Sequence, residues 1–290
     1  MAIAALMMVG GVAAGLFGSL LGLGGGVLIV PLLTIGFGLD IRTAVGVSLV
    51  SVIMTSSAAA GVYLERHVAN LRLGMSLELF TALGALIGGS VAFLVDERWL
   101  ALLFAALLTY VAITMGRSAL RTAGGPARDI AVEAVEADAS MATVDDETPR
   151  DGVESATGSR IDLDGPGYRV RRMGVGVIGA TGAGVVSALL GIGGGIIKVP
   201  LMHLVMGVPL RVATATSNLM VGITASASAV IYASRGGVDV FAAGPTAIGV
   251  FLGANLGSRL GHRVDLRILR WLFVAILLYT AYEMFQRGLA

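Results

Sequence analysis

The chain has 290 residues, of which 56% are hydrophobic and only 13% are charged, and its formal net charge is +1. A soluble domain carries roughly 25% charged residues, so an ordinary soluble domain is excluded. The apolar runs are continuous rather than alternating, which predicts an all-α integral membrane protein that contacts a lipid bilayer. Cysteine is absent, which excludes disulfides, thiol catalysis and cysteine-ligated metals.

The first apolar segment, residues 1–39, is too long for one crossing and is interrupted by four glycines between Gly22 and Gly26. A continuous helix over residues 3–39 would be about 55 Å long, whereas the hydrocarbon core of a bilayer is about 30 Å thick. Each flank of the glycines is short for a span. We therefore predict a re-entrant V, in which a half-helix enters, the chain turns near the midplane, and a second half-helix returns.

The later apolar stretches predict full crossings and a second V. Residues 174–208 form another over-long apolar segment with a glycine break, and we expect the same V there. Three spans follow each V, at residues 43–64, 79–95, 99–116, 212–234, 240–258 and 271–282.

A polar stretch, residues 122–168, separates the two sets of spans. Eleven of the 19 acidic residues lie between Asp129 and Asp164, and few large apolar side chains are present. Such a composition cannot bury enough surface to fold alone. We predict a flexible acidic linker between a first membrane repeat, residues 1–121, and a second, residues 169–290.

The second half repeats the first. Residues 14–66 align with residues 183–235 at a constant shift of 169 positions, and about 22 of the 53 pairs are identical. Both copies contain the motif L-G-x-G-G-G-x(4)-P, which ends at Pro31 in one copy and at Pro200 in the other. Duplicated halves with glycine-broken apolar segments are typical of secondary transporters, in which the breaks mark the substrate site.

Arginine positions indicate the topology. Two arginines, Arg150 and Arg160, lie far inside the linker. If both broken segments return to their starting side, thirteen of the other seventeen lie on the linker side and only four on the opposite side, namely Arg42, Arg98, Arg235 and Arg287. If both segments crossed instead, the split would be 10 to 7. The positive-inside rule favours the larger asymmetry. It predicts a multi-pass protein of the cell membrane with a cytoplasmic linker, both termini outside, and two halves inverted relative to one another.

The paired motif resembles the TauE/SafE family, also called the toluene sulfonate uptake permease family. The Ala-Thr-Ser-Asn run at 215–218 and the hydrophilic linker between similar halves strengthen the resemblance, which covers residues 8–118 and 170–285. It implies transport of sulfur-containing anions, such as sulfite, sulfoacetate, taurine-like compounds or other sulfonates. Substrate and direction vary among members of the family.

The glycine tips are the predicted site for a small anionic substrate. Glycine lets a ligand approach the backbone closely, and each tip begins a half-helix whose free N–H groups and dipole favour an anion. The alternative is that the glycines only permit tight helix packing. The predicted binding residues at the tips are Gly24, Gly25, Gly26, Gly193, Gly194 and Gly195.

Hydroxyl-rich segments follow each tip and could donate hydrogen bonds to sulfonate oxygens. Ser48 and Ser217, which are equivalent positions in the repeat, are the leading candidates, and Asn218 lies beside Ser217. The alternative is that these hydroxyls bond to their own helix backbone.

Four charged residues extend the predicted site. Lys198 lies inside an apolar run near the second tip, where a cation indicates function, although a lysine can also reach the interface. Arg42 and Arg211 would attract anions at the two mouths or act as interface anchors. Glu78 could carry a coupling proton, and a position at the lipid interface is the alternative.

Other classes of function have weaker support. The chain shows no nucleophile–base pair and no metal-ligand spacing, so we predict no enzyme activity, metal or cofactor. It has no nucleotide or nucleic-acid motif. The leading hypothesis is a secondary transporter that works by alternating access with the anion between the two tips. The alternatives are an uncoupled channel or facilitator, and a scaffold or receptor that acts through the linker. The sequence does not determine whether the protein forms a homo-oligomer.

Overall fold

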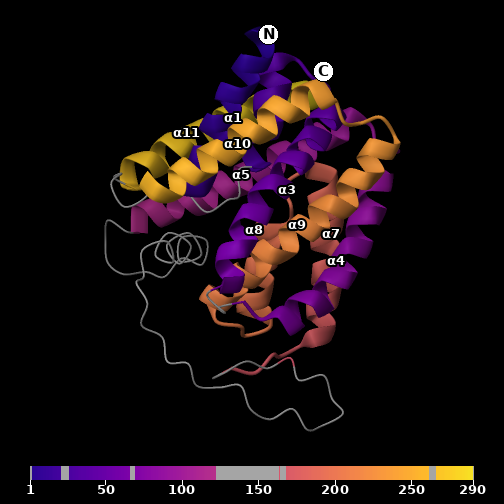
Figure 1. Cartoon of the computed structure of the whole chain (residues 1–290), viewed down its shortest axis with the longest axis vertical. Coiled ribbons are helices and arrows are strands. Elements are labelled where there is room, and N and C mark those ends of the chain that lie inside the picture. Colours follow the sequence, from indigo (N-terminus) through magenta and orange to yellow (C-terminus); the bar gives the residue numbers. More distant parts are fainter. Residues whose placement is uncertain are drawn as a thin grey trace.

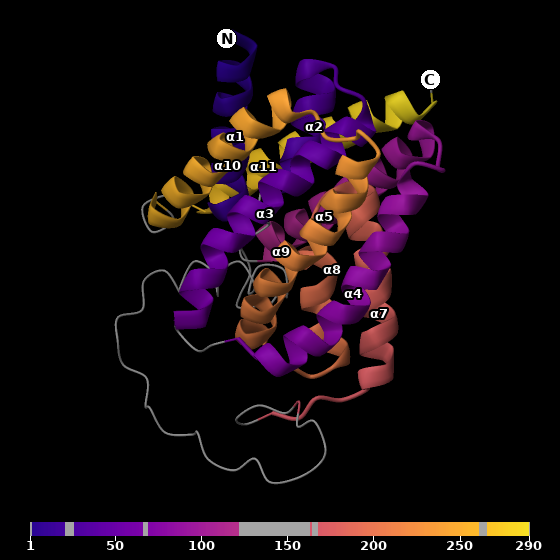
Figure 2. The same ribbon diagram turned by 45° about the vertical axis from the view of Figure 1, so that its right-hand side comes forward.

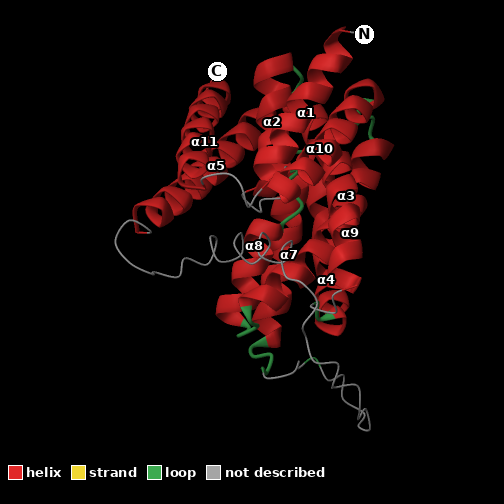
Figure 3. Ribbon diagram, turned by 60° about the vertical axis from the view of Figure 1, so that its left-hand side comes forward, coloured by secondary structure: helices red, strands yellow, loops and turns green. Residues whose placement is uncertain are grey.

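The computed structural model describes residues 2–20, 26–65, 69–121, 163, 168–260 and 266–289, and over these residues the protein is an all-helical bundle, as predicted (Figures 1 and 3). The first half contains α1 (Ala2–Leu20), α2 (Gly26–Pro31), the π-helical turn η1 (Leu32–Gly36), α3 (Ile41–Glu65), α4 (Leu71–Ala92) and α5 (Glu97–Arg121). The second half contains α7 (Met173–Leu190), α8 (Gly195–Pro200), the π-helical turn η2 (Leu201–Val205), α9 (Leu210–Ser234), α10 (Val240–Leu260) and α11 (Leu266–Leu289).

Within the described part of the chain, six helices contain stretches long and apolar enough to cross a membrane: α1, α4, α5, α7, α9 and α10. α1 and α7 have 19 and 18 residues, which corresponds to about 28 Å at 1.5 Å per residue. The expectation that both arms of each V are too short to span is therefore wrong for the first arms. The glycines follow a span-length helix, and only the returning arms are short, with 6 residues in α8 and 5 in η2.

Each returning arm changes from α-helix to a π-helical turn directly after a proline, Pro31 or Pro200. Proline has no N–H to donate to the carbonyl four residues earlier, and its ring clashes with that carbonyl. The regular bonding pattern is therefore interrupted at this point, where a wider turn fits. The proline that ends the repeated motif thus explains where each short α-helix changes into a π-helical turn.

Both broken segments reverse direction and return beside their first arm. A Cβ atom at Gly10 would lie 2.9 Å from a Leu32 methyl group, and one at Gly179 would lie 2.6 Å from a Leu201 methyl group. α1 begins at the end of the molecule where both termini lie, whereas α7 begins at the opposite end (Figures 1 and 2). The two hairpins therefore enter the bundle from opposite ends. Their inversion relative to a bilayer stays a prediction.

The two halves pack into each other. The most extensive helix contacts join α1 to α10, α4 to α7, α5 to α11 and α3 to α9, and each joins one half to the other. Glycines bring the backbones together: Gly15 lies against the carbonyl of Val250, and Gly184 lies against the carbonyl of Thr81. The two contacts are equivalent in the repeat, because a shift of 169 positions converts Gly15 into Gly184 and Thr81 into Val250. The repeat in the sequence is therefore matched by a repeat in the packing.

The start of α4 and the described end of the linker share one end of the bundle. Asn70 caps α4, because its side-chain oxygen accepts a hydrogen bond from the Leu73 N–H. Its amide donates to the Leu163 carbonyl at 3.0 Å and to the Tyr168 hydroxyl at 2.8 Å. The rest of the predicted linker lies outside the described residues, so its role as a boundary between two domains stays a prediction.

Candidate functional site

The second glycine turn needs glycine for its backbone and for space. Gly191, Gly193 and Gly194 have φ angles of 68°, 74° and 80°, in the left-handed region that glycine adopts without a steric cost. A Cβ atom at Gly193 would also lie 2.6 Å from Val221 Cγ1. The whole turn is buried. The repeated glycine motif is thus explained by a tight reversal inside the bundle.

The two tips, which were predicted to face each other, are in contact. A Cβ atom at Gly26 would lie 3.1 Å from the carbonyl oxygen of Gly191 and 3.4 Å from Ile192 Cα. The Ser48 hydroxyl bridges them, 2.8 Å from the Gly191 carbonyl oxygen and 3.2 Å from that of Gly26. In this structure Ser48 therefore donates to the backbone of the tips. The predicted ligands Gly24 and Gly25 lie outside the described residues.

Two hydroxyls beside the second tip have no such bond. Ser187 in α7 and Ser217 in α9 are completely buried, and neither Oγ atom has a hydrogen-bond partner among the described residues. A Cβ atom at Gly194 would lie 3.2 Å from Ser187 Cβ, and one at Gly195 would lie 3.8 Å from Ser217 Oγ. An unsatisfied buried polar group costs about 1–3 kcal/mol, so these hydroxyls need water or a ligand.

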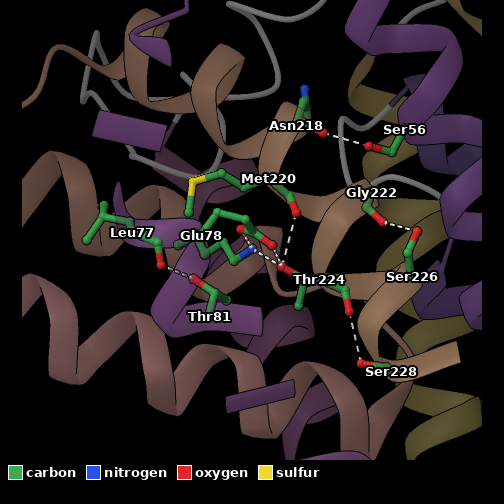
Figure 4. A network of polar contacts seen from close by, with 11 residues as sticks. Ser56, Leu77, Glu78, Thr81, Asn218, Met220, Gly222, Thr224, Ser226 and Ser228 are labelled. Atoms are coloured by element: carbon green, nitrogen blue, oxygen red, sulfur yellow. Dashed lines mark hydrogen bonds and ion pairs between the residues drawn. The ribbon is translucent and has the colours of Figure 1, made fainter. Parts of the chain in front are cut away.

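A buried ion pair lies next to the same tip. The ammonium of Lys198 lies 3.2 Å from Glu78 Oε2 and 2.5 Å from Thr224 Oγ1, and the Thr224 hydroxyl lies 2.7 Å from Glu78 Oε1 (Figure 4). Only 1% of the lysine side chain and 5% of the glutamate side chain are exposed. The interface alternatives for both residues are therefore wrong. α4 begins at Leu71, which places Glu78 two turns inside the helix.

The ion pair belongs to only one of the two repeats. A Cβ atom at Gly194 would lie 3.4 Å from the Cε atom of the lysine, so the pair adjoins the second tip. The repeat preserves the hydroxyl of Thr224 as Thr55, but the positions equivalent to the lysine and the glutamate are Ile29 and Ala247. The Thr55 hydroxyl bonds to carbonyls of its own helix. Charge is thus concentrated at the second tip.

A cavity of about 380 Å³ lies between α3, α4 and α9 and reaches Glu78. Asn70, at the linker end of the bundle, lines it as well, so the cavity connects that end with the ion pair. Its other lining residues are Ile53, Ser56, Ser57, Leu71, Gly74, Met75, Thr216, Leu219, Met220, Gly222, Ile223 and Ser226.

Arg42 and Asn218 are not part of the ion pair. The Arg42 guanidinium donates to the carbonyls of Ala92 and Val95, at 3.3 and 2.8 Å, and forms an ion pair with Glu97 at 3.5 Å, which joins α3 to the α4–α5 turn. The Asn218 carbonyl accepts a hydrogen bond from Ser56 at 2.6 Å. The side chain of Asn218 points away from Glu78 (Figure 4). The side chain of Arg211 lies outside the described residues.

Sequence reasoning missed Ser187 and the partnership of Glu78 with Lys198. One signal could have indicated the partnership: both residues are charges inside apolar segments, and a buried charge needs an opposite charge. Ser187 gave little signal, because a helical serine ordinarily bonds to its own backbone.

Comparisons with known proteins agree with this architecture. Residues 7–284 match the family model described as sulfite exporter TauE/SafE. The chain is also similar to a protein of Bacillus subtilis (strain 168) described as "Probable membrane transporter protein YunE", with 23% identity over 291 residues, which cover 98% of both chains. No solved structure matches the chain significantly. Because the family model covers nearly the whole chain and the described helices include six of membrane-spanning length, the chain belongs to the sulfite exporter TauE/SafE family of membrane transporters.

Proposed function

We propose that the protein is a secondary transporter of sulfur-containing anions, organosulfonates or sulfite, and that it works by alternating access. The observation that carries the proposal is the set of buried donors at the second tip, where the unpartnered hydroxyls of Ser187 and Ser217 lie near Lys198. The description of the family as sulfite exporters supports a sulfur oxyanion as the substrate.

The chemistry of the tip suits a compact oxyanion. Sulfonate and sulfite present three oxygens that each accept hydrogen bonds, and the two serine hydroxyls can donate to them. The six-residue helix α8 begins at this tip. Its first N–H groups can add donors there, although those of Ile197 and Lys198 already donate to the Gly194 carbonyl. The buried ammonium of Lys198, which is paired with Glu78 in this structure, lies beside the same tip. Acetate, with two oxygens, would use fewer of these donors.

The packing of the helices supports alternating access. The hairpin of α7 and α8 packs on α4 of the first half, and the hairpin of α1 and α2 is joined to α10 of the second half. The two hairpins are in contact where Gly26 meets the Gly191 turn. Movement of one packed unit against the other would open the tips first to one end of the bundle and then to the other, as in other repeat transporters.

Binding to detergent-purified protein tests the site. We expect sulfite, sulfoacetate and isethionate to raise the thermal midpoint, because a ligand that binds only the folded state stabilises it, and acetate to have a smaller effect. Ser187→Ala and Ser217→Ala should each weaken isethionate binding by about tenfold or more, because a hydrogen bond to a charged group contributes about 1.5–3 kcal/mol.

Ser51→Ala is the matched control. Ser51 is also completely buried, but its hydroxyl donates to the Val47 carbonyl of its own helix at 3.1 Å, so its loss should leave affinity unchanged. Wild-type affinity in both Ser187→Ala and Ser217→Ala would place the anion elsewhere. Equal binding of acetate and isethionate would contradict the predicted preference for sulfur oxyanions.

A further inference from the structure

The positive charge of Lys198 is already neutralised before a substrate arrives. Its ammonium contacts the Glu78 carboxylate and the Thr224 hydroxyl, and the same hydroxyl contacts the carboxylate (Figure 4). All three residues are at least 96% buried. The carboxylate therefore occupies the position where an anionic substrate would gain most from the lysine.

Among the described side chains, no other charged or titratable group faces this pair. α7 contains no titratable residue. The hydroxyl of Tyr232 on α9 and the imidazole of His203 on η2 are each bonded to a backbone carbonyl. On α3, Arg42 is held at the α4–α5 turn, and on α4 itself Arg72 is exposed. The side chains of Arg211 and residues 58–65 lie outside the described set.

The charge balance at the second tip links substrate and proton. An anion that contacts Lys198 while Glu78 is ionised would place two negative charges beside one positive charge in a buried site. Uncompensated buried charge is strongly unfavourable. If Glu78 takes up one proton, the ammonium can pair with the anion, and the neutral carboxyl can keep a hydrogen bond to Thr224. Neutrality is then restored with one proton for each monovalent anion.

The cavity gives the proton a route to the carboxylate. Glu78 lines it, whereas Lys198 and Thr224 do not, and the cavity leads to the linker end of the bundle. The cavity therefore leads from the linker end of the bundle to the Glu78 carboxylate without passing the lysine. The hydroxyls of Ser56 and Ser226 line the same space.

We propose that Glu78 is a proton-binding site and that its ion pair with Lys198 is a lock opened by protonation, so that the protein is a proton–anion symporter. This inference rests on the proposed function, because it needs an anionic substrate at the second tip. The proton adds to a carboxylate oxygen of Glu78, the bond to the ammonium is released, and the anion takes the place of the carboxylate. Release of the anion and the proton restores the ion pair.

Proteoliposomes with a pH-sensitive dye and labelled isethionate test the proposal. Isethionate stays a monovalent anion over the whole working pH range, so any proton movement does not come from its own titration. The wild-type protein should move about one proton with each isethionate, as the charge balance requires, and an acidic exterior should drive its accumulation. Glu78→Gln should bind isethionate independently of pH and exchange it without proton movement.

Glu283→Gln is the matched control, since Glu283 is a carboxylate within the apolar part of α11 and is not part of the lock. It should keep the wild-type coupling. Isethionate flux without protons in the wild type, or full coupling in Glu78→Gln, would overturn the lock and leave sulfonate transport intact. Absence of any flux of isethionate or sulfite would instead contradict the proposed function. A wild-type protein that moves isethionate without protons overturns the proposal even if Glu78→Gln does not fold.

Discussion

Lys198 and Glu78 should control the stability of the protein as a pair. Removing one partner leaves an uncompensated buried charge, which costs about 3–5 kcal/mol, whereas removing both charges can be nearly neutral. We expect Lys198→Met to lower the thermal midpoint of detergent-purified protein strongly, and the double variant Lys198→Met with Glu78→Gln to recover most of the loss. A double variant as unstable as Lys198→Met alone would show that the ion pair does not govern stability.

Single residues of this site could be predicted only in part. Lys198 and Glu78 were recognisable as charges in apolar segments, but 120 positions separate them and their pairing depends on how α4 and α8 both pack on α9. Ser48 and Ser217 are equivalent in the repeat, yet Ser48 bonds to two carbonyls and Ser217 has no partner among the described residues. Identical residue types at equivalent positions therefore cannot reveal which hydroxyl is available.

Close contacts between helices of different halves should hold the elements in place. At Gly184 in α7, the carbonyl of Thr81 leaves no room for a Cβ atom, whereas at Gly182 a Cβ atom would meet nothing within 4 Å among the described residues. Overpacking costs about 1–3 kcal/mol, and alanine is favoured over glycine in a helix by about 1 kcal/mol. We expect Gly184→Ala to lower the thermal midpoint and Gly182→Ala to leave it unchanged or raise it.

Equal effects of Gly184→Ala and Gly182→Ala would contradict close packing of α4 against α7. The presence of the helices was predicted, since long apolar runs identify them without tertiary information. However, α3 and α11, which cover the predicted spans 43–64 and 271–282, are not among the six described helices that are long and apolar enough to cross a membrane. The unequal arms of the two hairpins were not predicted. Apolar length alone does not show where within 1–39 or 174–208 the chain reverses, and the packing around Gly26 and Gly191 fixes that point.

At the scale of the whole molecule, the two halves share their core. The fully buried rings of Phe104 in α5 and Phe273 in α11 belong to one hydrophobic cluster, although they come from different halves. The sequence predicted two similar halves, but a repeat does not indicate which helices pair. Only the folded structure shows that the main helix contacts join helices of different halves. This arrangement gives each hairpin a neighbour from the other half.

The most direct test of the central claim is counterflow of isethionate in proteoliposomes. Vesicles preloaded with unlabelled isethionate are diluted into labelled isethionate, with no pH gradient and no membrane potential. A carrier that alternates around one site predicts transient accumulation of label above its equilibrium level, which excess external sulfite should suppress and acetate should not. Equilibration without this overshoot would indicate a channel, and no uptake of either sulfur anion would contradict the account.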